Sequence, residues 1–141
     1  MHVRELTRRK YKAGEEISVR GPEDVVKILG KMRRYRKEHF VALLLNARHA
    51  CIAVETISIG TLNASLVHPR EVFQPAVEQT AAALILAHNH PSGDPAASEE
   101  DVQLTGRLVQ AGRIMGIEVL DHVIIARGGH LSLKTRHWPD S

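Results

Sequence analysis

Two short apolar runs, at residues 40–46 (FVALLLN) and 82–90 (AALILAHNH), constrain the fold of this chain most strongly. Each run has the length and composition of a buried β-strand. The segments between and around them carry apolar residues at helical spacing instead. Strands and helices therefore alternate along the sequence, which indicates an α/β fold.

Further strands follow from apolar and β-branched residues bounded by turns. Residues 50–59 form a second strand that pairs with 40–46 as an antiparallel hairpin, with the turn at residues 47–49. A last strand at residues 118–126 is followed by a glycine turn and a short returning strand at 130–133. The sequence also predicts one short strand at residues 16–19.

Three helices are expected. The first begins at Pro22, carries two acidic residues in its first turn and ends near residue 37 in a cluster of cations that suits the negative end of the helix dipole. The second begins at Pro69 and runs to about residue 82, with Pro75 inside it. The third spans residues 98–116, with Ser98 at its start.

A chain of 141 residues, 43% of them hydrophobic, has the size and composition of one globular domain. Residues 1–20 are polar and aperiodic, and we interpret them as a basic N-terminal arm that precedes a domain at 21–141.

Residues 1–37 contain twelve Lys/Arg and five Asp/Glu, a net charge of +7, and the remaining residues have a net charge of −4. This basic region suggests weak contact with nucleic acid, although cations at a helix end are commonly a solvated face. Aromatic residues are only 4%, which argues against base-stacking platforms.

Cysteine content and apolar run length exclude other classes. Cys51 is the single cysteine, so no internal disulfide can form, and one cysteine cannot by itself build a thiolate zinc site. The N-terminal sequence has no apolar stretch of the signal-peptide kind, and the longest apolar run is too short to cross a bilayer. We therefore expect a cytoplasmic protein without a membrane partner.

His88 and His90 point to chemistry at the end of the second apolar run. Side chains two residues apart on a strand lie on the same face, so both imidazoles can approach one metal ion. Asp101 follows a Gly/Pro-rich loop, in the first turn of the third helix, and can supply a third ligand. A His, His, Asp set leaves one position of a tetrahedral zinc open, as catalytic sites do.

A structural explanation competes with this one. Ser98-x-x-Asp101 is also a good helix-capping sequence, with serine as N-cap and a carboxylate at the third helical position. That explanation accounts for Ser98 and Asp101 completely, but not for the two histidines. The residues alone leave the metal site and the capping box as open alternatives, which are partly compatible.

The same residues resemble a known signature. His88-Asn89-His90-Pro91, six further residues and Ser98-x-x-Asp101 match the H-x-H-P-x6-S-x2-D motif of the JAMM (MPN-type) metalloproteases. The segments GTLNASLVHPREVF, HNHPSGDPAASEED and LDHVIIA are similar to the RadC-like branch of that superfamily, and the resemblance covers about residues 22–133. It implies a mixed central sheet flanked by helices, of the cytidine-deaminase-like or MPN type, with the metal at one sheet end.

The resemblance also implies a site. His88, His90 and Asp101 would bind one Zn²⁺ per chain, with a water as the fourth ligand. Glu38 matches the family's upstream glutamate and would act as general base, accepting a proton from that water and passing it to the leaving amine. Ser98 would hold the water or donate to the developing oxyanion.

Three functions follow as hypotheses. The leading one is a zinc-dependent metallopeptidase or isopeptidase that acts on a peptide or protein substrate. The second is a nucleic-acid-associated protein, related to DNA repair, in which zinc is secondary; the third is a non-catalytic MPN scaffold. Asp121-His122 attracts less attention, because adjacent strand residues point to opposite faces and a role in maintaining the fold is the simpler interpretation.

Overall fold

A seven-stranded sheet forms the centre of the computed structural model, which describes residues 8–63 and 65–139. The strands along the sheet are in the order β1-β4-β3-β5-β6-β7, and β2 pairs with β4. Only β5 and β6 pair in parallel among these strands, so the sheet is mixed, as expected. The strands are β1 (Arg8–Lys10), β2 (Ile17–Ser18), β3 (His39–Leu45), β4 (Ala50–Ile59), β5 (Ala83–Asn89), β6 (Glu118–Ala126) and β7 (Gly129–Ser132).

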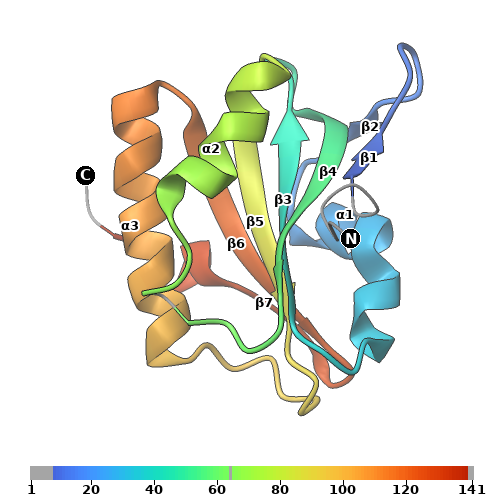
Figure 1. Ribbon diagram of the computed structural model, residues 1–141. Coiled ribbons are helices and arrows are strands. Elements are labelled where there is room, and N and C mark those ends of the chain that lie inside the picture. Colours follow the sequence, from blue (N-terminus) through green and yellow to red (C-terminus); the bar gives the residue numbers. More distant parts are fainter. Residues whose placement is uncertain (1–7, 64, 140–141) are drawn as a thin grey trace, which may run out of the picture.

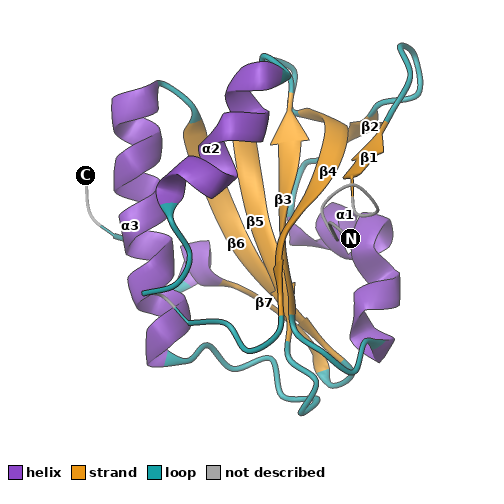
Figure 2. Ribbon diagram, in the orientation of Figure 1, coloured by secondary structure: helices purple, strands orange, loops and turns teal. Residues whose placement is uncertain are grey.

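Helices cover both faces of this sheet (Figures 1 and 2). On one face lie α2 (Pro69–Glu78) and α3 (Glu99–Met115), and on the other lie α1 (Pro22–Leu29) and the 3-10 helix η2 (Gly30–Arg34). A second 3-10 helix, η3 (Leu133–Thr135), follows β7. The central strand β3 contributes to both cores: Ala42 and Leu44 pack beneath α2 and α3, whereas Leu43 and Leu45 pack beneath α1. The apolar run that suggested a buried strand is therefore apolar because both of its faces are covered.

The first helix is shorter than the sequence suggested. We expected helix to about residue 37, but α1 ends at Leu29 and the chain continues as η2 to Arg34, then turns extended at Tyr35. Gly30, a poor helix former, lies at the change. The predicted end was wrong because residues 30–34 form a 3-10 helix, from which Met32 is buried although the α-helix has already ended.

The second helix also ends early, at Glu78 rather than near residue 82. It begins as expected at Pro69, where Glu71 accepts a hydrogen bond from the backbone N–H of His68 and completes a capping box. Thr80 adopts a left-handed conformation with φ of 52°, which helix cannot continue through. The third helix agrees with expectation: Ser98 is its N-cap, and Gly116, with φ of 72°, ends it.

The N-terminal arm contributes one more strand than expected. Both β1 and β2 pair antiparallel with β4, β1 opposite residues 53–55 and β2 opposite residues 50–51. Arg8 forms an ion pair with the buried carboxylate of Glu55. Residues 8–18 thus cover the outer edge of β4; the domain boundary after residue 20 stays a prediction.

The connection from β5 to β6 positions the candidate site. Because these neighbouring strands are parallel, the chain must return along the sheet between them, and α3 makes that crossover. The C-terminal end of β5 and the first turn of α3 therefore lie at the same end of the sheet. None of the helices within residues 8–63 and 65–139 has the length and apolar character needed to span a membrane.

Candidate metal centre

Two imidazoles converge at the end of β5. His88 is fully buried and His90 is partly exposed, and their Nε2 atoms lie 2.8 Å apart. β5 ends at Asn89, and the backbone N–H of His90 still donates to the carbonyl oxygen of Ile125 on β6 before the chain turns into a loop. The expectation that both side chains share one face is confirmed.

The carboxylate of Asp101 reaches both histidines from the first turn of α3. Its Oδ1 lies 3.1 Å from Nε2 of His88, and its Oδ2 lies 3.2 Å from Nε2 of His90. The capping box is present as well: the backbone N–H of Asp101 donates to Oγ of Ser98 at 3.1 Å, and the N–H of Ser98 donates to Oδ2 of Asp101 at 2.8 Å. The capping box and a metal site are therefore compatible, because the cap fixes the carboxylate that faces the histidines.

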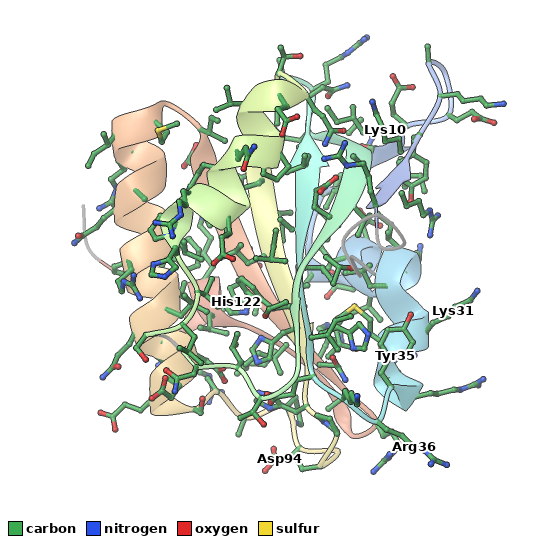
Figure 3. All side chains as sticks on the ribbon, in the orientation of Figure 1. Lys10, Lys31, Tyr35, Arg36, Asp94 and His122 are labelled. Atoms are coloured by element: carbon green, nitrogen blue, oxygen red, sulfur yellow. The ribbon has the colours of Figure 1, made fainter. Side chains whose placement is uncertain are left out.

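The outer nitrogens of both rings have partners of their own. Nδ1 of His90 lies 2.9 Å from the carbonyl oxygen of Asp94, and Nδ1 of His88 lies 2.7 Å from Nε2 of His122. Figure 3 shows Asp94 in the loop at this end of the sheet and His122 inside the molecule, between the sheet and the layer of α2 and α3. Each ligand candidate is thus held on its far side, which leaves Nε2 for a metal.

This set of donors fits a metal ion. One ligand atom each from His88, His90 and Asp101 lies within 4.8 Å of the others, and this is the one such group among the described residues. Two atoms bound to one zinc at about 2.0–2.2 Å are at most about 4 Å apart. The separations of 2.8, 3.1 and 3.2 Å satisfy that limit, and the three residues could hold one metal ion.

The electrostatics of the group favour a cation at its centre. Burial works to raise the pKa of Asp101, but hydrogen bonds from His88 and His90 outweigh it and keep that pKa well below its ordinary value. For His90, burial lowers the pKa, but hydrogen bonds to Asp101 and to the Asp94 carbonyl raise it overall, with a smaller contribution from the charge of Glu38. Burial lowers the pKa of His122 well below the ordinary value and keeps that ring neutral.

Glu38 lies immediately before β3, half-buried, on the rim of a cavity of about 510 Å³. Its Oε2 accepts a hydrogen bond of 2.6 Å from the backbone N–H of Leu62. Gly60, Thr61 and Pro91 also line this cavity, so the residue next to the His90 ligand candidate and the carboxylate of Glu38 border the same space. The roles of Glu38 as general base and of Ser98 in catalysis stay predictions.

The sequence interpretation undervalued His122. Its ring contacts His88, and its Nδ1 lies 2.6 Å from the hydroxyl of Thr105 on α3. Asp121 indeed points the other way, where it accepts hydrogen bonds from the hydroxyl of Ser132 and the backbone of Lys134. One sequence feature could have pointed to Thr105, the partner of His122: Thr105 follows Asp101 by four residues, so both lie on one face of α3.

Comparison with known proteins identifies the family. A model of the RadC-like JAB domain matches residues 19–138, most of the chain. The chain belongs to the RadC-like JAB domain family. The two histidines, the aspartate and strands β3 to β7 all lie within the matched region, whereas β1 and β2 precede it.

Relatives with the same domain occur in several bacteria. The chain is 57% identical to a UPF0758 protein of Caldanaerobacter subterraneus over 128 residues, which cover 90% of this chain and 55% of that protein. It is 54% identical to a UPF0758 protein of Alkaliphilus metalliredigens (84% of the chain, 51% of the relative) and 50% identical to one of Bacillus cereus (94% and 59%). The RadC-like chain thus spans about half the length of the curated relatives it matches.

Proposed function

We propose that this RadC-like domain is a zinc-dependent hydrolase of peptide or isopeptide bonds. The observation that supports it most directly is the convergence of two Nε2 atoms and one carboxylate on a common centre at the end of the sheet. His88, His90 and Asp101 would hold the metal, one ion per chain. When bound, zinc would supply a Lewis acid that acidifies water and polarises a carbonyl group.

In this proposal Glu38 moves the proton. The hydrogen bond from the N–H of Leu62 fixes one carboxylate oxygen. The other oxygen can accept a proton from the attacking water and then give it to the nitrogen that leaves, so that the scissile C–N bond breaks and a neutral amine departs. A carboxylate is suited to both transfers because the same oxygen can take up a proton and later release it.

Ser98 would act beside it as a hydrogen-bond donor. Its oxygen already accepts from the N–H of Asp101, and a hydroxyl has one hydrogen left to donate. Ser98 is exposed at the start of α3, so that hydrogen can be directed at the oxyanion that develops on the carbonyl. The N-cap would thus serve both the helix and the reaction.

The test has two stages. We expect elemental analysis to find one zinc per chain in the purified protein. Protein that contains no zinc and has no affinity for added zinc would refute the proposal. Zinc-loaded protein would then be incubated with peptide libraries and with isopeptide-linked substrates, and new amines would be mapped by mass spectrometry. Glu38→Gln should keep the zinc and lose turnover, while Glu118→Gln, an exposed glutamate on β6, should change neither. Bound zinc without any turnover would instead indicate a non-catalytic scaffold.

Binding of nucleic acid is a second candidate function. A cavity of about 700 Å³ is lined by residues of α1, η2 and strands β1, β3 and β4, and its lining includes Arg8, Arg9, Lys27 and Lys31. Lys31, Tyr35 and Arg36 lie on this same side of the molecule (Figure 3). Phosphate contacts by such cations would make affinity fall steeply with salt. Binding of a DNA or RNA oligonucleotide that is absent, or equal at 50 and 200 mM salt, would refute this function.

A further inference from the structure

The two histidines of the metal centre are oriented by different means. Nδ1 of His90 faces the carbonyl oxygen of Asp94, and a carbonyl can only accept a hydrogen bond. The hydrogen that His90 would keep when a metal is bound is therefore the one on Nδ1, and Nε2 would then offer its lone pair to the metal. Nδ1 of His88 faces another imidazole, that of His122, at 2.7 Å. Either ring can donate in such a pair, so this contact alone does not fix which nitrogen of His88 carries the hydrogen.

Two further contacts extend the His88–His122 pair into a series of hydrogen bonds. Nδ1 of His122 lies 2.6 Å from the hydroxyl oxygen of Thr105, and that hydroxyl lies 2.6 Å from the backbone carbonyl oxygen of Asp101. All of these side chains are fully buried or nearly so, which excludes water as an alternative partner. This series of hydrogen bonds begins at one candidate ligand, His88, and ends on the backbone of another, Asp101.

We propose that Thr105 and His122 are positioning residues that fix the tautomer of His88 required for metal binding; this rests on the proposed metal site. The carbonyl of Asp101 can only accept, so the single hydrogen of the Thr105 hydroxyl is directed at it. The hydroxyl oxygen then accepts from Nδ1–H of His122. Nε2 of His122 is left bare and accepts from Nδ1–H of His88, and Nε2 of His88 is left bare toward the metal.

The direction in which these hydrogen bonds are donated has an energetic consequence. A metal on His88 requires a hydrogen on Nδ1 of His88, and each donor along the chain then needs the acceptor that follows it. Removal of the Thr105 hydroxyl would leave Nδ1–H of His122 buried without an acceptor, which is unfavourable. The opposite tautomer of His122 would avoid that loss, but it would place a hydrogen on Nε2 of His88 or leave two donors facing each other. Metal binding should therefore weaken although no ligand is changed.

The test compares Thr105→Val with Thr105→Ser. Valine keeps the volume and removes the hydroxyl, whereas serine keeps the hydroxyl. We expect zinc affinity, measured by competition with a chelator, to fall about 10- to 100-fold in Thr105→Val and to stay within about 3-fold of wild type in Thr105→Ser. Thr105→Val combined with His122→Phe should bind no more weakly than His122→Phe alone, because Thr105 acts through His122. Melting temperatures of the metal-free variants separate this effect from a loss of stability.

A second measurement reads the tautomers directly. In zinc-loaded, ¹⁵N-labelled wild type, two-bond ¹H–¹⁵N spectra should show both His88 and His122 with the hydrogen on Nδ1. A hydrogen on Nε2 of His122 would reverse the chain and overturn the inference, as would equal zinc affinity in wild type and Thr105→Val. If the wild type binds no zinc, the proposed function itself is wrong and the inference falls with it.

Discussion

The side-chain amide of Asn89 holds the backbone on both sides of Glu38. Its Oδ1 accepts from the N–H of His39 at 2.7 Å, and its Nδ2 donates to the carbonyl oxygen of Lys37 at 3.1 Å. Asn89 stands between the two histidines of the motif and is almost fully buried. Successive strand residues point to opposite faces, so the histidines turn to the candidate metal centre while the residue between them turns to the segment that carries the candidate base.

The first prediction concerns this amide. Asn89→Ala would leave the N–H of His39 and the carbonyl of Lys37 without their side-chain partner, at a cost of about 1–3 kcal/mol for each group that stays dry. We expect a lower free energy of unfolding in urea, unchanged zinc content and reduced hydrolysis on a substrate found as above, because Glu38 loses its fixed position. Gln110→Ala, at an exposed amide on α3, should stay within about 0.5 kcal/mol of wild type. Full turnover in Asn89→Ala would show that the amide does not position Glu38.

The second prediction concerns metal and stability. A metal that binds only the folded chain adds RT ln(1 + [L]/Kd) to stability, about 2.7 kcal/mol at 100 times Kd. The melting temperature should therefore rise on adding zinc and fall on adding a chelator. His90→Ala removes one of three donors and should abolish most of the rise, whereas His130→Ala, whose Nε2 lies 3.6 Å from the Glu23 carboxylate, should retain it. An equal rise in both variants would mean that zinc binds elsewhere.

The sequence predicted those features that depend on local pattern. Period-two spacing placed His88 and His90 on one face, and capping chemistry placed Ser98 and Asp101 at the start of α3. The apolar run of β3 and its hairpin with β4 were also confirmed. Each of these depends on neighbours within a few residues, which a single sequence displays directly.

Features that depend on distant partners could not be predicted in this way. The short strand β1 is polar and its residues are exposed, and it forms because the outer edge of β4 is available for pairing. The contact of His122 with His88 joins residues 34 positions apart on adjacent parallel strands, and no local pattern encodes it. The early end of α1 follows similarly from how η2 packs Met32 into the core rather than from helix propensity alone.

The third prediction concerns two glycines of α3. A Cβ at Gly112 would lie 2.5 Å from the backbone carbonyl oxygen of Ile117 and 3.2 Å from the side chain of Val119, so the helix could not stay so close to the chain that leads into β6. Gly112→Ala should therefore destabilise the protein by about 1–3 kcal/mol, as overpacking does. A Cβ at Gly106 would meet nothing within 4 Å. Gly106→Ala should stabilise the protein by about 0.5–1 kcal/mol in urea unfolding. A change in unfolding free energy of the same sign in both variants would contradict the packing argument.

The fourth prediction concerns Cys51. Its side chain is fully buried in β4 beneath α1, and burial raises the pKa of the thiol from 9.0 to about 11. Between pH 9 and 11 the thiol of the unfolded chain ionises while that of the folded chain stays protonated, so the unfolded state binds fewer protons. Stability from this group is therefore complete below pH 9 and decreases as pH rises, by about 1.4 kcal/mol per unit at most.

Cys51→Ala isolates that effect. The loss of side-chain volume lowers stability by the same amount at every pH, whereas the pH-dependent contribution of the thiol is absent from the variant. The difference in unfolding free energy between wild type and Cys51→Ala should stay constant from pH 7 to 8.5 and shift against the wild type from pH 9 to 10.5. Tyr11 is present in both proteins, and burial, the largest cause of its raised pKa, does not involve the thiol; the smaller contribution from the charge of Cys51 is removed in Cys51→Ala together with the ionisation under test. The buried thiol should also resist alkylation by iodoacetamide at pH 8 until urea unfolds the chain, and rapid alkylation of the folded protein would show that Cys51 is accessible.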